Sequence, residues 1–218
     1  AIVSIIIAGF SISEDYGISW DESPQRNGAV STLKYVAENF GITHQAFEHI
    51  VDMDNNVNAY AAPYAMIFDF PTIILDEILM LEDDRSVFLM RHKMTFLFYF
   101  FGVLSFFFTS KEIFGKYGHA LLAVLIYTLH PRIFGNSFYN PKDIIFLSTV
   151  SLSILCTVKF LIYKNNRWWF LSGVTTGLAM STRIVGMYLL ILLLIITIFE
   201  ILLFENSKEN ILLWDIIK

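Results

Sequence analysis

The fold is decided near the C-terminal end of the chain, where residues 168–204 read WWFLSGVTTGLAMSTRIVGMYLLILLLIITIFEILLF. As one continuous helix rising about 1.5 Å per residue, this stretch would be about 55 Å long, whereas the hydrocarbon core of a bilayer is about 30 Å thick. We therefore predict two membrane-spanning helices, Trp168–Thr182 and Ile184–Phe204, with a turn of the chain near Arg183–Gly186.

Similar apolar runs lie farther toward the N-terminus. Three of them form the centres of further predicted spans: Met94–Thr109, Tyr117–Pro131 and Ile144–Tyr163. Gly173 and Gly177 have the spacing of a small-residue packing notch between transmembrane helices. The chain is 56% hydrophobic and only 16% charged, whereas soluble domains are nearer half apolar and about a quarter charged. The sequence therefore predicts an all-α fold, a polytopic transmembrane helix bundle.

Acidic residues gather in one segment near the N-terminus. Between Ser13 and Arg85 lie fourteen of the twenty acids but only three of the fifteen bases, which argues against a nucleic-acid-binding surface. Ser23 is suited to cap a helix, with Pro24 at its first position. This helix would have one apolar face and end at a glycine: Val30, Leu33, Ala37, Phe40 and then Gly41. We predict that it and a second short helix, Thr43–Asp52, lie flat on the membrane.

Residues 63–81 are apolar enough to span a membrane but carry three acids and an internal proline. Asp69 and Asp76 are two helical turns apart and share a face. Charges inside lipid are costly and normally face a cavity or a partner. An interfacial or re-entrant helix is therefore favoured over a true span.

Basic residues indicate the orientation of the spans. They flank three short loops: Lys111 and Lys116, then Lys164 and Arg167, then Lys208. Counting spans from Met94 places all three loops on one side, which the positive-inside rule makes cytoplasmic. The loop 132–143 and the turn at Arg183 then lie on the external side. The acidic segment lies there too, provided that residues 63–81 do not cross the membrane.

The domain organisation follows from these assignments. We expect residues 1–12 to be the end of a first transmembrane helix, 13–90 an external acidic loop with interfacial helices, and 91–204 a bundle of about five spans. Residues 205–218 would form a cytoplasmic tail or begin the next segment. Because the chain starts inside an apolar run and ends just after another helix would begin, we expect it to be part of a longer protein. Its single cysteine, Cys156, excludes an internal disulfide.

The first chemically suggestive motif is Asp21-Glu22, just beyond the first span. Paired carboxylates at a membrane surface can act as a general base or as metal ligands. The simpler alternative is that both acids only favour the start of the next helix through its dipole.

The second motif is Asn140-Pro141-Lys142-Asp143, which opens the span at Ile144. Asparagine at the N-cap and proline at the next position are ordinary at helix starts. The same geometry also presents free N–H groups and positive potential to an anion. Lys142 adds a full charge, and Arg132 precedes it in the same loop, so the motif could hold a phosphate.

The third motif is Thr182-Arg183 at the predicted outer turn. The arginine either extends its charged end to the membrane surface or provides a second phosphate contact, since guanidinium matches phosphate oxygens.

In their order along the chain, these motifs resemble the GT-C superfamily of membrane glycosyltransferases. The similarity is greatest to the branch of bacterial dolichyl-phosphate-mannose protein mannosyltransferases and aminoarabinose transferases. Asp21-Glu22 matches the acidic pair of that branch's first external loop, and Asn140-Pro141-Lys142-Asp143 with Arg132 matches a later helix start. The stretch 171–186, LSGVTTGLAMSTRIVG, is similar to a third family segment. The family usually has eleven or more spans, whereas about six are predicted here, so the resemblance implies an N-terminal portion of a longer enzyme.

The resemblance implies transfer of a hexose or pentose from a polyprenyl phosphate to a protein or glycolipid acceptor, with inversion, at the external face of a bacterial plasma membrane. Asp21, Glu22 and Asp143 would be the catalytic carboxylates, with Asp21 as the general base. The groups expected to bind the phosphate are Asn140, Lys142, Arg132 and Arg183. The cofactor stays open, with a divalent cation as the candidate.

Two functions of other classes compete with this one. A transporter or lipid flippase would use charges such as Asp69, Asp76 and Arg183 along a path through the membrane. Inverted internal repeats would favour it, and the sequence shows none. A non-catalytic subunit of a membrane assembly would tolerate loss of both carboxylate motifs.

Overall fold

A computed structural model describes residues 2–41, 65–81 and 83–206. Within these ranges the ordered elements are helical and no strand occurs. The all-α prediction is therefore confirmed. The predicted helix Thr43–Asp52 and the basic residue Lys208 lie outside the described residues.

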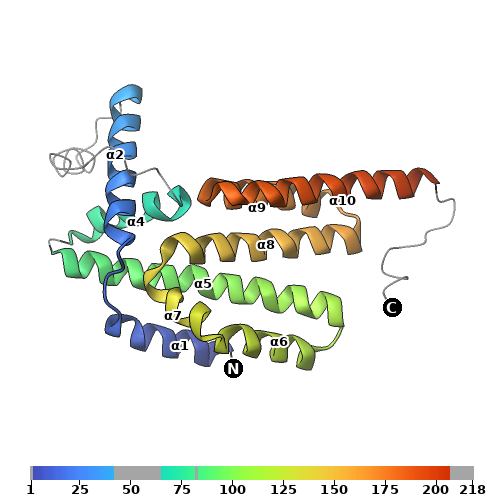
Figure 1. Ribbon diagram of the computed structural model, residues 1–218, viewed down its shortest axis with the longest axis horizontal. Helices are drawn as coiled ribbons and strands as arrows, with labels where there is room; N and C mark the ends of the chain where they lie inside the picture. Colours follow the sequence, from blue (N-terminus) through green and yellow to red (C-terminus); the bar gives the residue numbers. More distant parts are fainter. Residues whose placement is uncertain (1, 42–64, 82, 207–218) are drawn as a thin grey trace.

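Most of the helices run nearly parallel and form an elongated bundle (Figure 1). They are α1 (Ile2–Ile12), α5 (Asp84–Phe114), α6 (Tyr117–Leu129), α8 (Pro141–Tyr163), α9 (Asn166–Thr182) and α10 (Met187–Asn206). By length and composition, α5 and α8 could each cross a membrane, and two shorter apolar helices, Tyr117–Leu129 and Ile184–Glu200, accompany them. Every predicted span coincides with a helix except at two ends. Pro131 begins the next helix, α7 (Pro131–Tyr139), and Ile184–Gly186 form a 3-10 turn before α10.

The predicted turn near Arg183 is confirmed. Helix α9 ends at Thr182, a single 3-10 turn covers Ile184–Gly186, and α10 begins at Met187. A Cβ atom on Gly186 would lie only 2.7 Å from the backbone N and Cα of Met180. The turn therefore folds back against α9 so closely that a larger side chain does not fit.

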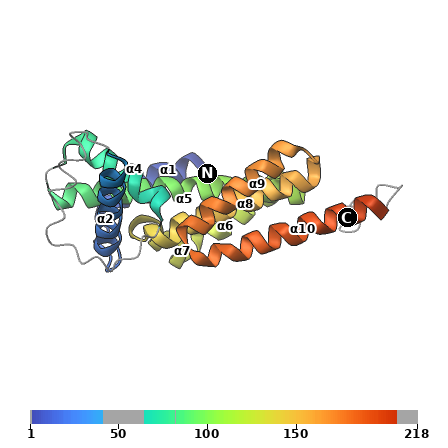
Figure 2. The same cartoon turned by 90° about the horizontal axis from the view of Figure 1, so that it is seen from above.

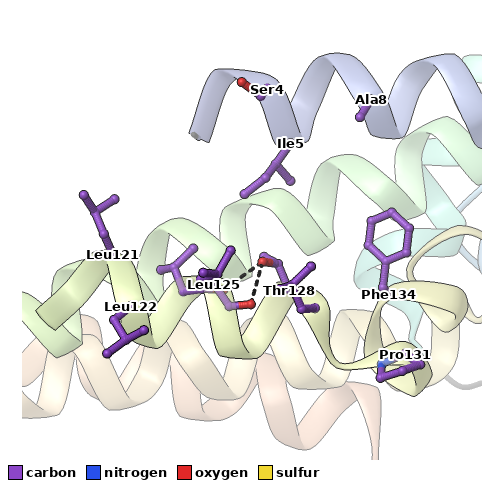
Figure 3. A pocket seen from close by; sticks show the side chains of 11 residues that line it. Ser4, Ile5, Ala8, Leu121, Leu122, Leu125, Thr128, Pro131 and Phe134 are labelled. Carbon is purple, nitrogen blue, oxygen red and sulfur yellow. Dashed lines mark hydrogen bonds between the residues drawn. The ribbon is translucent and has the colours of Figure 1, made fainter. Parts of the chain in front are cut away.

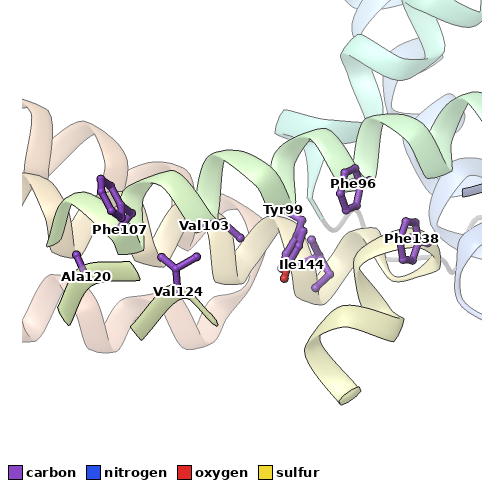
Figure 4. Packing of buried hydrophobic residues seen from close by; sticks show 8 residues of the cluster. All are labelled: Phe96, Tyr99, Val103, Phe107, Ala120, Val124, Phe138 and Ile144. Atoms are coloured by element: carbon purple, nitrogen blue, oxygen red, sulfur yellow. The ribbon is translucent and has the colours of Figure 1, made fainter. Parts of the chain in front are cut away.

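A hydrophobic core joins α5 to α6, α7 and α8 (Figure 4). Its buried residues are Phe96, Tyr99, Val103, Phe107, Ala120, Val124, Phe138 and Ile144. Gly102 lets α5 approach α8, because a Cβ there would lie 2.8 Å from Ser148 Oγ and 3.1 Å from its Cα. The predicted notch at Gly173 and Gly177 is unoccupied in the described part of the chain, since nothing beyond the backbone and sequence neighbours of α9 itself lies within 4 Å of a Cβ built on either residue.

Helix α2 (Glu22–Phe40) crosses one end of the bundle at a steep angle to the other helices (Figures 1 and 2). It begins at Glu22 with Asp21 at the N-cap, so Ser23 does not cap it as predicted, and it ends at Gly41 in the left-handed conformation, as predicted. The predicted apolar face is only partly confirmed, because Phe40 is 77% exposed.

The apolar face of α2 packs on another helix, α4 (Met66–Leu79). Ala29, Val30 and Leu33 of α2 form a small cluster with Ile73 of α4. With its 14 residues, α4 is about 21 Å long, shorter than a hydrocarbon core of about 30 Å. This length fits the expectation of an interfacial helix.

Both ends of the bundle are chemically distinct. The end that α2 crosses also holds the last turn of α1, helix α7, the start of α8 and the α9–α10 turn (Figure 1). The α5–α6 and α8–α9 connections lie at the opposite end. The basic residues in or next to them are Lys111, Lys116, Lys164 and Arg167. The motifs thus share one end, and the basic loops share the other.

Replacing Gly102 with leucine tests the close contact between α5 and α8. We expect Gly102→Leu to destabilise the protein by about 1–3 kcal/mol through overpacking, measured as a lower midpoint of thermal unfolding in detergent. Gly173→Leu is the matched control, because the space around Gly173 is open. Equal effects of the two substitutions would contradict this account of the packing.

Candidate active site

The start of α8 is built by its own side chains. The Asn140 Oδ1 accepts a hydrogen bond from the backbone N–H of Asp143 at 3.1 Å, and the Asn140 amide donates to Asp143 Oδ2 at 3.2 Å. Pro141 follows the cap at the first helical position. The predicted helix start is confirmed, and these contacts fix the orientation of the Asp143 carboxylate.

Asp143 also contacts Arg183, which the sequence places forty residues away. The guanidinium Nη1 of Arg183 donates to Asp143 Oδ1 across the gap between α8 and the α9–α10 turn. Both side chains are partly exposed, 34% for Arg183 and 46% for Asp143. The second and third motifs therefore form one solvent-accessible ion pair.

The first motif is brought to the same place by Ser19. The Ser19 hydroxyl donates a hydrogen bond to the backbone carbonyl of Tyr139 at 2.8 Å. The ring of Tyr16 stacks on Phe138 with 4.3 Å between centroids. The loop before α2 is thereby attached to the residues just before Asn140.

The two acids of the first motif have opposite environments. Asp21 is exposed and makes no side-chain capping bond in the described structure, whereas Glu22 is fully buried. The Ser19 N–H donates to Glu22 Oε2 at 2.7 Å, and His92 Nε2 lies 3.2 Å from Glu22 Oε1. Only Asp21 of this pair therefore presents its carboxylate to solvent.

The remaining predicted phosphate ligands lie at the same end of the bundle. Arg132 is exposed in the first turn of α7, and Lys142 is partly exposed in the first turn of α8. The candidate site thus combines the exposed Asp21 with cationic groups from three segments.

A buried polar seam connects α2 and α4 to the start of α5, and sequence reasoning missed half of it. Arg91 of α5 pairs with Asp69 of α4 at 2.6 Å and donates to Thr72 Oγ1 at 2.9 Å. Gln25 of α2 donates to the other oxygen of Asp69 at 2.7 Å. Burial raises the pKa of the Asp69 carboxyl, while Arg91 and the hydrogen bonds oppose that rise.

A second ion pair, Arg26–Asp76 at 2.6 Å, extends the seam toward solvent. The prediction that Asp69 and Asp76 share a helix face and meet partners is confirmed. Four residues of this region were not identified from the sequence: Gln25, Arg26, Arg91 and His92. Only one feature of the sequence could have indicated them, which is the adjacent basic pair Arg91-His92 just before a predicted span.

A groove of about 680 Å³ lies between α1, α6 and α7 (Figure 3). Its lining is almost entirely apolar: Ser4, Ile5, Ala8, Leu121, Leu122, Val124, Leu125, Thr128, Leu129, Pro131 and Phe134. Pro131 and Phe134 belong to α7, the helix that carries Arg132 and leads to Asn140. The groove therefore runs along the bundle toward the end that holds the polar motifs.

Carboxylates at a membrane surface can also bind a metal ion. Among the residues that the structure describes, no three His, Cys, Asp or Glu side chains come together as a metal site. Asp143 and Glu22 instead contact Arg183 and His92.

Removing Arg91 tests the seam. Because its side chain is 1% exposed and that of Asp69 is 0% exposed, Arg91→Met leaves a buried carboxylate unpaired and should cost about 3–5 kcal/mol of stability. Arg26→Met, in the more exposed pair, should cost less. Unfolding in detergent of Arg91→Met, Asp69→Asn and the double variant measures the coupling between them. Simple additivity would rule out the proposed pairing.

Comparison with known proteins agrees with the motifs. The family model for dolichyl-phosphate-mannose-protein mannosyltransferase matches residues 78–214, more than half of the chain. The matched part contains Arg132, Asn140–Asp143 and Arg183, whereas Asp21-Glu22 precedes it. No curated protein and no solved structure gives a match. The chain therefore belongs to the dolichyl-phosphate-mannose-protein mannosyltransferase family and is a membrane glycosyltransferase of the GT-C type.

Proposed function

We propose that this protein transfers a sugar from a polyprenyl-phosphate donor to an acceptor hydroxyl at the external face of a bacterial plasma membrane. The observation that carries the proposal is the hydrogen bond from Ser19 to the Tyr139 carbonyl. It holds the loop of Asp21 against the cationic start of α8, so that a base and anion-binding groups share one end of the bundle.

The donor phosphate would bind at the start of α8. The helix dipole places positive potential at the N-terminus of α8, and Lys142 and Arg132 add full charges nearby. Negative charge grows on the departing phosphate during transfer, so cations already in place lower the barrier. Arg183 contributes from the α9–α10 turn, oriented by its contact with Asp143.

Asp21 is the general base in this proposal. Its exposed carboxylate accepts the proton of the acceptor hydroxyl as the hydroxyl oxygen bonds to the anomeric carbon of the sugar. The bond from that carbon to the phosphate oxygen breaks, and polyprenyl phosphate leaves with the electron pair. A direct displacement of this kind inverts the anomeric centre. Glu22, enclosed by Ser19 and His92, positions the loop.

The apolar groove suits the hydrocarbon chain of the donor. It is lined by α1, α6 and α7, and its α7 end adjoins Arg132 in the sequence. An isoprenoid chain in this groove would place the attached phosphate at the polar end of the bundle. A lipid-linked donor therefore accounts for both the apolar and the cationic parts of the surface.

The external location rests on charge asymmetry. Lys111, Lys116, Lys164 and Arg167 flank the connections at the opposite end of the bundle. Such an excess of basic residues in short loops is typical of the cytoplasmic side. The site would then open on the external side, where the acceptor is a protein or a glycolipid.

Asp21→Asn in the full-length protein tests the base. We expect kcat to fall by about 10²–10⁴-fold, the range that general base catalysis contributes, in transfer from a radiolabelled polyprenyl-phosphate sugar. Asp15→Asn is the matched control, because Asp15 is also exposed and lies in the same loop outside the motif. Normal turnover of a well-expressed Asp21→Asn variant would remove Asp21 from this role.

Leu125→Trp tests the groove. The larger side chain fills space that the isoprenoid chain would occupy, so KM for a long-chain donor should rise roughly tenfold, since overpacking costs about 1–3 kcal/mol. KM for a donor with a very short prenyl chain should change little. Ile126→Trp is the control, since Ile126 is 67% exposed and does not line the groove. Equal effects on both donors would exclude this path for the chain.

A further inference from the structure

We propose that His92 is a positioning residue for the transfer reaction, which holds Glu22 and thereby fixes Asp21 at the start of α2. The inference rests on the proposed role of Asp21 as the base. It assigns a function to a histidine that lies in α5, seventy residues away from Glu22 in the sequence.

The imidazole of His92 contacts Glu22 through Nε2, which hydrogen-bonds to Oε2 and lies within ion-pair distance of Oε1. Its side chain is 1% exposed, and Nε2 lies 3.2 Å from Oε1 and 3.4 Å from Oε2 of a carboxylate that is itself 0% exposed. The other ring nitrogen, Nδ1, has no hydrogen-bond partner in the described part of the chain. Burying a polar ring costs free energy unless its polar atoms find partners. The contact with Glu22 is the one that offsets this cost for His92.

Glu22 passes this constraint to the loop that carries Asp21. Its Oε2 accepts the Ser19 N–H at 2.7 Å, and the Ser19 hydroxyl donates to the Tyr139 carbonyl at 2.8 Å. The loop is therefore anchored on both sides of Asp21, by Ser19 before it and by Glu22 directly after it. His92 completes a continuous connection from α5 to the residue that precedes Asn140.

The geometry separates positioning from catalysis. Because His92 and Glu22 are enclosed by protein, neither meets the reacting atoms directly. A displacement of about 1 Å in a catalytic group can lower a rate about 10²-fold. Loss of the His92 contact should therefore reduce kcat through Asp21, while the donor-binding cations at the start of α8 keep their places.

His92→Gln and His92→Asn form the matched pair of variants for the full-length protein. Both are polar and smaller than histidine, but only the glutamine amide reaches the position of Nε2, whereas the asparagine amide corresponds to Nδ1. We expect His92→Gln to keep kcat near the wild-type value and His92→Asn to lower it roughly 10–100-fold, with KM for the donor changed less than about twofold.

The loop position can be measured independently of activity. Spin labels on Trp20→Cys and Gly135→Cys, in a Cys156→Ser background, report the distance between the loop and α7 by electron paramagnetic resonance. Trp20 is 93% exposed, and the space around a Cβ on Gly135 is open, so both labels fit. The distance distribution should stay narrow in His92→Gln and broaden in His92→Asn.

The two readouts distinguish the possible failures. If His92→Asn leaves both kcat and the distance distribution unchanged, the positioning role of His92 is overturned. If Asp21→Asn turns over normally while His92→Asn still broadens the distribution, Asp21 is not the base, yet His92 still anchors the loop. Reduced kcat and a broadened distribution in His92→Asn, both restored in His92→Gln, support the whole inference.

Discussion

Burial of charge at one end of the bundle is the constraint on which the site depends. Glu22, Asp69, Asp76 and Arg91 are each at most 3% exposed where α2 and α4 meet α5. An unpaired charge removed from water costs several kcal/mol, so each acid needs its partner from another helix. The apolar contact between α2 and α4 centres on four buried residues. The polar pairs therefore determine which turns of α2, α4 and α5 lie opposite one another.

The packing of α7 on α5 positions the other half of the site. Aromatic residues of α5 and α7, including the stacked pair Phe96 and Phe138 at 5.1 Å, fix α7 beside α5. Helix α7 leads directly into Asn140, so the same packing that holds the core also places the start of α8. The candidate site is therefore assembled from loops and helix ends whose positions are set by buried contacts nearby.

Much of the bundle could be predicted because membrane thickness limits helix length. The turn at Arg183–Gly186 followed from the length of the stretch 168–204, and the start of α8 followed from Asn140-Pro141. The predicted start of α2 was two residues too late, at Ser23 instead of Asp21, because aspartate and serine are both residue types that cap helices.

The partners across helices could not be predicted in the same way. Hydrophobic periodicity indicates a buried face but does not say which acid meets Arg91 or His92. The close contact at Gly102 was also missed, because it depends on the residue that the facing helix presents. The sequence predicted only that the motifs of Asp143 and Arg183 lie on the same side of the membrane. The structure adds the direct contact between the two side chains.

The contact between Arg183 and Asp143 has a consequence for how strongly the site retains an anion. A carboxylate already contacts the guanidinium, so a phosphate that binds as proposed would compete with it. The net attraction for that phosphate would then be weaker than the number of cations suggests. In the proposed reaction the product that leaves is again a lipid phosphate, and a site with tempered affinity releases it more readily, because tight holding of substrate and product alike does not raise kcat.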